Sequence, residues 1–230
     1  MSNGSWRERA AHKVAQTASK IPSEWRISPQ DCDRARTTRN ITGPFIQSFL
    51  LEREVEIVEL DSESFVRKIA SKSLSSLEVA NAYCKTAAIA HQIVSALIVD
   101  FTFSSAIFLC LLQTLIRLSC QNNCLHEIFF EEALACAKFL DQYLSEHGRT
   151  IGTLHGLPIS LKDQFHVKGN DTTMGYIGWI DTFEGNIDPV RTHKVESQVI
   201  GELYLTGAVL YCKVTSKCYN LNQSHIHAVC

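Results

Sequence analysis

Residues Gly152–Tyr176, GTLHGLPISLKDQFHVKGNDTTMGY, decide which fold this chain is expected to adopt. Within them, Leu157–Leu161 is a short apolar run bounded by glycine and by charged residues, which predicts a strand. The strand carries one lysine, Lys162, into apolar surroundings. Because burial disfavours the charged ammonium form, a lysine in such a place is expected to act as a proton acceptor.

Two helices are predicted before this strand. Ser75 and Glu78 fit a capping box, so a helix is expected to begin there and to run through His91. A second, amphipathic helix is expected over residues 127–147, with Gly148 as its stop. Its predicted buried stripe is formed by Phe130, Leu134, Ala137, Leu140 and Leu144.

A helix and a second strand are predicted after the quoted segment. Val195–Leu205 has helical spacing, Gly207 ends that helix, and Ala208–Lys213 is another apolar run. A strand, a crossover that contains a helix and a second strand are together the pattern of an α/β sheet. The fold class expected from the sequence is therefore α/β.

The first 73 residues predict a helical arm that wraps the main domain. Pro22 and Pro29 interrupt this arm. One helix is expected over Phe45–Glu52. Another is expected over Ser62–Ala70, with Asp61 as its N-cap.

The composition is that of an ordinary globular protein, with 230 residues of which 45% are hydrophobic and 20% charged. The formal net charge of −2 argues against nucleic acid as a partner, because nucleic-acid binding requires a basic face. Met1–Lys20 lacks the apolar stretch of a secretory signal, and the nine cysteines are scattered along the chain. A cytoplasmic protein with free thiols is therefore expected.

The motifs predict neither a cofactor nor a metal. The chain contains no phosphate-binding loop and no dinucleotide fingerprint. Cys218, His225, His227 and Cys230 offer metal-ligating atoms, but their spacing fits no common zinc module. We interpret these four residues as accidental neighbours in the sequence.

Several segments together resemble the amidase signature family, in its fungal acetamidase and general amidase branch. They are residues 21–26 (IPSEWR), 87–92 (AAIAHQ), 123–130 (NCLHEIFF), 155–176 and 207–213 (GAVLYCK). The resemblance implies an N-terminal, incomplete portion of a mixed β-sheet covered by helices. It also implies the hydrolysis of a small carboxamide to a carboxylic acid and ammonia, without a metal or an organic cofactor.

The resemblance assigns one catalytic residue. Lys162 matches the family lysine, which accepts a proton from a bridging serine that in turn deprotonates a nucleophilic serine. Both serines of this Ser-Ser-Lys triad lie in a Gly/Ser-rich segment of the family, and the 230 residues contain no such segment. The chain is thus expected to be an inactive, truncated fragment of an amidase-type hydrolase. Asp163 is expected to orient the loop that follows Lys162 or to accept hydrogen bonds from backbone amides, a role that the family pattern allows.

Ser160 offers a different nucleophile. Residues two apart on a strand share a face, so Ser160 and Lys162 could form a minimal Ser–Lys dyad. Their Cα atoms would lie roughly 6.5 Å apart, and no oxyanion hole is prepared beside them. We therefore interpret Ser160 as a structural residue.

Two departures from the family pattern both begin at a valine. Residues 94–121 separate two segments that are nearly adjacent in the family, and the pattern ends again after Lys213. Every valine codon begins with GT, the dinucleotide that opens most introns. The codons of Gln121 begin with CA, as in the CAG that closes most introns. We therefore hypothesise that two introns were translated. The predicted domains are then a helical arm (1–73), an amidase domain (74–213) interrupted by residues 94–121, and an unrelated tail (214–230).

Two other functions remain open. Phe101–Leu118 is just long and apolar enough to span a bilayer, which would make the chain a single-pass membrane protein. Five hydroxyl and amide side chains in that segment weaken this interpretation. The chain could also be a non-catalytic fragment that binds amides or a full-length paralogue. The expected partner is a small-molecule amide, a membrane is not expected, and a homo-oligomer is left open.

Overall fold

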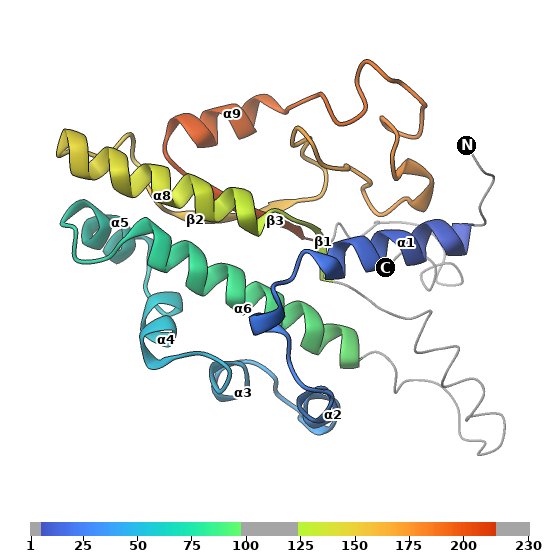
Figure 1. Cartoon of the computed structure of the whole chain (residues 1–230), viewed down its shortest axis with the longest axis horizontal. Coiled ribbons are helices and arrows are strands. Elements are labelled where there is room, and N and C mark those ends of the chain that lie inside the picture. The colour runs from blue at the N-terminus through green and yellow to red at the C-terminus, as the bar shows by residue number, and fades with distance from the viewer. Residues whose placement is uncertain (1–5, 98–123, 215–230) are drawn as a thin grey trace.

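The computed structural model describes residues 6–97 and 124–214 (Figure 1). Phe101–Leu118 and residues 215–230 lie outside these ranges, as do most of residues 94–121. Within the described ranges, no helix combines the length and the apolar character that a membrane span requires. The predicted boundaries of the insert and of the tail remain predictions.

Helices make up most of the described chain, and the strands form a single three-stranded sheet within it. The elements are α1 (Trp6–Ser19), the 3₁₀ turn η1 (Ser23–Trp25), α2 (Pro29–Thr37), α3 (Pro44–Gln47), α4 (Glu52–Val58), α5 (Ser62–Ala70), α6 (Ser76–Leu97), β1 (Leu125–Ile128), α8 (Phe130–His147), β2 (Pro158–Lys162), the 3₁₀ turn η3 (Ile177–Trp179), α9 (Gln198–Leu205) and β3 (Val209–Val214).

The sheet is mixed, with strand order β1-β3-β2. The central strand β3 is antiparallel to β1 and parallel to β2. The chain passes from β2 through α9 to β3, and this crossover is why the two strands are parallel. The predicted α/β class, with a strand, a crossover helix and a second strand, is confirmed.

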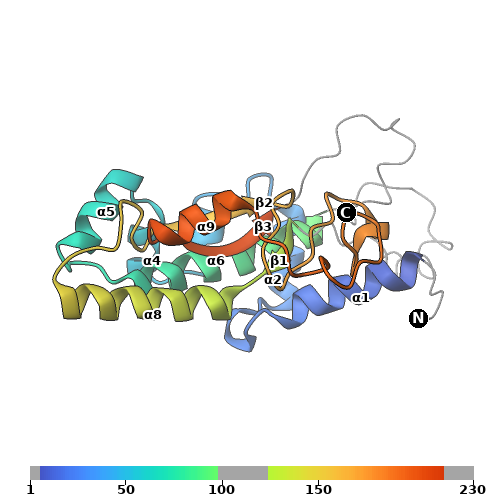
Figure 2. The same cartoon turned by 90° about the horizontal axis from the view of Figure 1, so that it is seen from above.

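Helices cover both faces of the sheet. The long helices α6 and α8 run side by side (Figures 1 and 2) and share one apolar cluster with Val209 and Cys212 of β3. The opposite face of β3 packs Leu210 against Ile200 of α9 and Leu161 of β2. The sheet therefore lies between the α6–α8 pair and α9, with the central strand β3 largely buried and part of β2 exposed.

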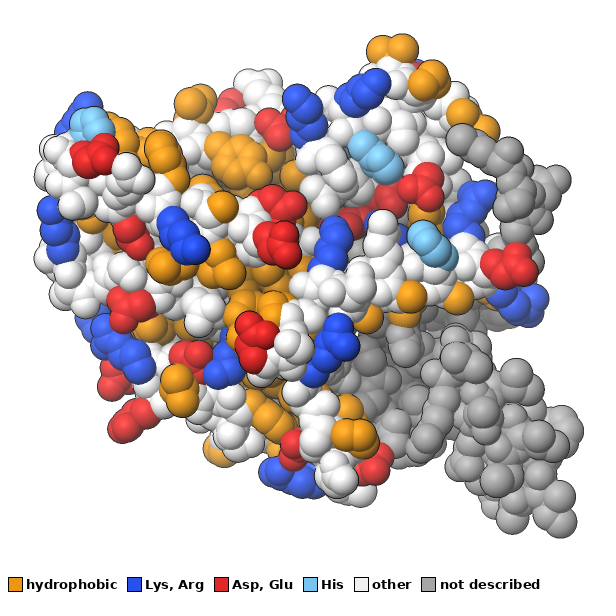
Figure 3. Space-filling view, in the orientation of Figure 1, with side chains coloured by type: hydrophobic (Ala, Val, Ile, Leu, Met, Phe, Trp, Pro, Cys, Tyr) orange, Lys and Arg blue, Asp and Glu red, His pale blue; other side chains and the backbone are white. Residues whose placement is uncertain are grey.

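The N-terminal arm packs mainly along α6. Ala35 of α2 contacts a cluster with Ile89 and Ile93 on the C-terminal half of α6. Phe65 and Ile69 of α5 belong to a second cluster at the N-terminal half of α6. On the face shown in Figure 3, basic and acidic side chains are interspersed over these elements.

Two predicted N-caps are confirmed by hydrogen bonds. Asp61 accepts the N–H of Ser64 at 2.8 Å, and α5 begins and ends where the sequence predicts. The Ser75 hydroxyl accepts the N–H of Glu78 at 3.1 Å, while the Glu78 carboxylate accepts the N–H of Ser75 at 3.0 Å. Both caps depend on residues three apart, which is why the sequence alone reveals them.

The predicted helix over residues 127–147 begins too early. The helix α8 starts at Phe130 because Leu125–Ile128 pairs with β3 as the strand β1. Its end is predicted correctly: Gly148 adopts the left-handed conformation with φ of 65° and stops the helix.

The predicted helix over Phe45–Glu52 is wrong. The chain forms the short α3, and α4 begins only at Glu52. Leu51 is extended and donates its N–H to the Glu54 carboxylate at 2.8 Å, so this residue caps α4 rather than continuing α3.

The chain passes close to the start of α6 just before it enters β2. Gly156 has φ of +78°, and a Cβ there would collide with Ser76 and Ile69. The Gly156 N–H donates to Gly207 O at 2.8 Å, which joins the starts of β2 and β3. A glycine is therefore required at position 156, in the loop that connects α8 to β2.

The N-terminus of α6 is also capped from α8. The Asp141 carboxylate accepts the N–H of Ser76 at 2.7 Å and that of Leu77 at 3.0 Å. These two amides have no carbonyl partner in the first turn of a helix, so Asp141 both satisfies them and locks α8 to α6.

We predict that Asp141→Ala lowers the free energy of unfolding by about 1–2 kcal/mol, the usual effect of losing a helix cap. Urea unfolding followed by circular dichroism measures this change. The matched control is Glu146→Ala, which removes an exposed acid five residues further along α8 and should change stability by less than about 0.5 kcal/mol. Equal effects of the two substitutions would contradict the capping role.

Candidate functional site

The candidate site lies where β2 and β3 end. Parallel strands bring their carboxyl ends to one edge of a sheet, and ligands of α/β proteins bind at that edge. In the observed register, Leu161 is opposite Lys213 and Lys162 is opposite Val214. Two lysines, Lys162 and Lys213, therefore lie near the carboxyl ends of the two parallel strands.

Lys162 is exposed, so the expectation that burial desolvates it is wrong. It is the last residue of β2, and β2 lies at the edge of the described sheet. Leu161 is buried toward α9, and side chains alternate along a strand, so Lys162 lies on the other face together with the exposed Ser160. Its assignment as the catalytic base remains a prediction.

The buried lysine is Lys213, which is 0% exposed. Its ammonium donates to Asp171 O at 2.6 Å and to Thr172 Oγ1 at 2.8 Å. Nζ also lies 3.8 Å from Asp163 Oδ1. Burial lowers the pKa of Lys213, and the carboxylate of Asp163 opposes that shift.

Asp163 is buried beside Lys162 and orients the loop after it, as the sequence predicts. Its Oδ2 accepts the hydroxyl of Thr173 at 2.7 Å and lies 2.9 Å from His126 Nδ1. Burial raises the pKa of this carboxyl, but the partners His126, Thr173 and Lys213 together lower it below the usual value. Asp163 thus connects β1, the end of β2 and the following loop.

Asp171 connects the same loop to α1. Its Oδ2 accepts the ammonium of Lys13 at 2.8 Å, and Lys13 also pairs with the buried Glu127 of β1. Its Oδ1 accepts the N–H of Asp181 at 2.9 Å and lies 2.7 Å from His193 Nε2. Burial raises the pKa of Asp171, and Lys13 and the other donors bring it below the usual value. These contacts hold α1 over the end of the sheet.

These groups form one connected assembly, buried except for the partly exposed Lys13 and His126, which we call the polar cluster. Its members are Lys13, His126, Glu127, Asp163, Asp171, Thr172, Thr173 and Lys213. Sequence reasoning singled out Asp163 among them, and the resemblance to amidases placed Thr172 and Thr173 in a turn near the pocket. The terminal lysine of the second apolar run was a visible signal for Lys213, whereas the sequence gives no sign that Lys13 approaches Asp171.

One group in the described chain resembles a metal site. Asp171, Asp181 and His193 place three potential ligand atoms within 4.8 Å of one another. The oxygens of Asp171 already accept hydrogen bonds from Lys13 and from the Asp181 amide, and Oδ1 also contacts His193. We interpret the group as part of the loop's hydrogen bonding. The expectation that the protein uses no metal remains a prediction.

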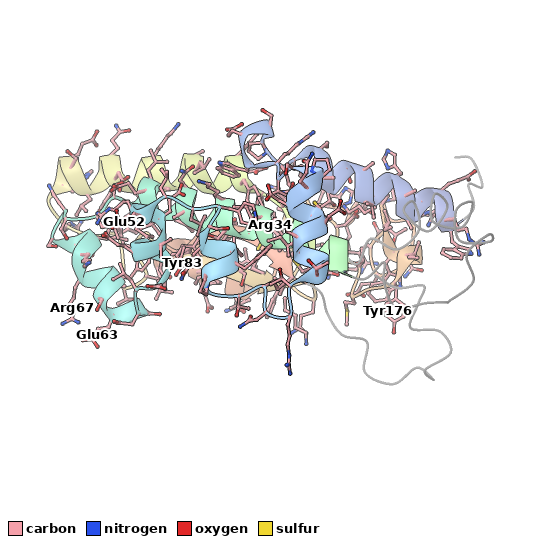
Figure 4. All side chains as sticks on the ribbon, turned by 90° about the horizontal axis from the view of Figure 1, so that it is seen from below. Arg34, Glu52, Glu63, Arg67, Tyr83 and Tyr176 are labelled. Atoms are coloured by element: carbon pink, nitrogen blue, oxygen red, sulfur yellow. The ribbon has the colours of Figure 1, made fainter. Side chains whose placement is uncertain are left out.

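Aromatic residues support the sheet behind the site. Tyr83 of α6, labelled in Figure 4, meets Tyr211 of β3 edge-to-face with ring centroids 6.3 Å apart. Burial raises the pKa of both phenols. Tyr176 lies at the far end of the loop and is partly exposed beside Trp179.

The comparisons with known proteins agree with this architecture. The family profile described as Amidase matches residues 108–224, about half of the chain. The chain belongs to the amidase family. The acetamidase of Emericella nidulans is 36% identical to it over 211 residues, covering 92% of this chain and 31% of that protein. An amidase of Gibberella moniliformis is 35% identical over 222 residues, covering 93% of this chain and 34% of that protein.

A solved structure shows the same fold. A fatty acid amide hydrolase matches with a TM-score of 0.68 and 27% sequence identity, covering 91% of this chain and 31% of that one. The predicted fold, a portion of the amidase-signature fold, is confirmed. The chain spans about a third of the length of the relatives that it matches.

His91 joins α6 to the strand β1 next to the polar cluster. Its Nδ1 accepts the N–H of Leu125 at 3.3 Å, and the residue is 4% exposed. Burial lowers the pKa of His91 to about 4, and the neighbouring His126 contributes to that shift. The folded protein therefore holds His91 neutral near pH 7.

We predict that acid destabilises the fold through His91. The usual pKa of histidine is about 6.5, so below that pH the unfolded chain takes up a proton that folded His91 does not take up until about pH 4. Its contribution is present above about pH 6.5 and lost as the pH falls, by up to roughly 3 kcal/mol. Urea unfolding between about pH 7 and 4 should show a smaller loss for His91→Gln. Identical pH dependence in both proteins would overturn this account.

Proposed function

We propose that this chain supplies the general-base part of a carboxamide hydrolase. The observation that supports this most strongly is the position of Lys162 at the end of β2, where two parallel strands finish in a protein of the amidase family. An exposed amine at that edge can meet a substrate, whereas the buried Lys213 cannot. The reaction converts an amide and water into a carboxylate and ammonia.

In the proposed reaction, Lys162 acts as the general base. It accepts a proton from a serine hydroxyl, which removes the proton of a second serine as that oxygen attacks the amide carbonyl. The C–N bond breaks, the amine leaves with a proton, and water then cleaves the acyl–serine ester. The one serine of β2, Ser160, is interpreted as structural, so the proposed scheme takes both serines from outside this strand.

The proposed substrates are small carboxamides. Support comes from relatives named acetamidase and amidase, which match more than nine-tenths of this chain. A cytosolic location is part of the proposal, and the free thiols of Cys84, Cys136 and Cys212 suit a reducing compartment. Ser-Ser-Lys chemistry and the interpretation of the chain as a fragment rest on the sequence resemblance alone.

We predict that the 230-residue chain alone does not release ammonia from acetamide above background. A triad acts as a unit, so a base without its nucleophile contributes little. A coupled ammonia assay across a range of acetamide concentrations measures this. Saturable release that disappears in Lys162→Ala would show that the chain contains its own nucleophile.

A chimera tests the proposed role of Lys162 directly. Residues 1–213 without residues 94–121 replace the matching part of the Emericella nidulans acetamidase. We expect the chimera to hydrolyse acetamide and Lys162→Met to lower kcat/KM by at least about 10³-fold, as for other triad members. The matched control is Lys168→Met, because Lys168 is exposed in the same loop and lies outside the polar cluster.

Two outcomes of the chimera experiment would contradict the proposal. One is an active chimera in which Lys162→Met has no effect. The other is an active chimera in which Lys168→Met is as harmful as Lys162→Met. A second chimera that retains residues 94–121 tests the translated-intron hypothesis, which predicts that this version loses activity.

A further inference from the structure

We propose that Lys213 is a positioning residue for Lys162. Its buried ammonium holds the turn Asp171–Thr173, and this turn holds Asp163, the residue next to Lys162. The proposal rests on the proposed function only for the catalytic meaning of Lys162. The positioning itself follows from contacts among the described residues.

The first step is the fixation of the turn. The Lys213 ammonium donates to Asp171 O at 2.6 Å and to Thr172 Oγ1 at 2.8 Å. Lys213 lies on the central strand and is 0% exposed, so water does not compete for these bonds. The turn is therefore attached to β3 by a charged donor whose stem is fixed in the sheet.

The second step is the fixation of Asp163 by the turn. Thr173 donates its hydroxyl to Asp163 Oδ2 at 2.7 Å. The neighbouring Thr172 donates to Phe165 O at 3.3 Å, two residues further along the same loop. Both ends of the short loop after Lys162 are thus bonded to the residues that Lys213 holds.

The third step is the charge of Lys213. Asp163 Oδ1 is buried and makes no hydrogen bond within the described residues, and the Lys213 ammonium lies 3.8 Å from it. Removing one partner of a buried ion pair leaves the other charge uncompensated, which is costly. The carboxylates of Glu127 and Asp171 and the ammonium of Lys13 also face Lys213, so its charge balances a group of acids.

The consequence concerns the direction of Lys162. A general base must lie within hydrogen-bond reach of the proton that it removes, so the backbone that carries it must be fixed. Lys162 is exposed on an edge strand, so its own side chain contributes little to fixing the backbone that carries it. The neighbouring Asp163 is buried and accepts a hydrogen bond from Thr173, and Lys213 fixes the segment that carries Thr173.

Hydrogen exchange measured by mass spectrometry on the full chain tests this inference. In Lys213→Met, we expect exchange in residues 163–176 to rise by about 10–100-fold, while exchange in α6 and α8 stays within about twofold. Lys213→Gln keeps amide donors without the charge and should give an intermediate rise. The matched control is Lys20→Met, because Lys20 also contacts the cluster at Glu127 but makes no bond to the turn.

A local rise confined to residues 163–176 supports positioning. No rise there, or an equal rise along the whole chain, overturns it. If Lys213→Met does not fold, Thr173→Val replaces it, because this variant removes the bond between the turn and Asp163 and leaves Lys213 in place. The inference then fails if Thr173→Val leaves exchange at Asp163–Phe165 unchanged.

A second measurement follows Lys162 itself. Pulse acetylation with acetic anhydride at one fixed pH, read by mass spectrometry, gives a labelling rate for each lysine. We expect the labelling rate of Lys162 to change in Lys213→Met because its backbone is held less firmly, while that of Lys168 does not change, and an unchanged Lys162 rate overturns the inference. The proposed function fails separately, through an active Lys162→Met chimera.

Discussion

The end of the sheet depends on the pairing of buried charges. Three carboxylates (Glu127, Asp163 and Asp171) meet the ammonium groups of Lys13 and Lys213 where water is largely excluded. Breaking one such pair costs about 3–5 kcal/mol, because the remaining charge is left without a partner. The pairs therefore require that α1, β1, β3 and the loop after β2 come together in one arrangement, and that arrangement presents Lys162.

Local chemistry explains which parts of the fold the sequence predicts. The caps at Asp61 and Ser75 and the stop at Gly148 involve residues within one helical turn, so a short window contains the whole interaction. The strand Leu125–Ile128 has only four residues and exists because it pairs with β3, which comes some 85 residues later. The local sequence around β1 contains no sign of this distant partner, and its pattern predicts the start of a helix instead.

The same distinction explains the two lysines. Both apolar runs end in a lysine, and nothing within either run tells which lysine is buried. Lys213 is buried because β3 is the central strand, and Lys162 is exposed because β2 is at the edge of the described sheet. The resemblance to amidases points to Lys162 by position in the motif, while the desolvation argument describes Lys213. The contact between Lys13 and Asp171 joins residues 158 apart, beyond any spacing argument.

The central claim is that Lys213, and not Lys162, is the lysine whose ammonium is buried and hydrogen-bonded inside the protein. Nitrogen-15 NMR of the lysine ammonium groups tests it most directly, because a buried, hydrogen-bonded ammonium exchanges its protons slowly with water. The account predicts a slowly exchanging ammonium signal with nuclear Overhauser contacts to Thr172, lost in Lys213→Met, and no such protected signal for Lys162. A protected signal that vanishes in Lys162→Met and persists in Lys213→Met would contradict it.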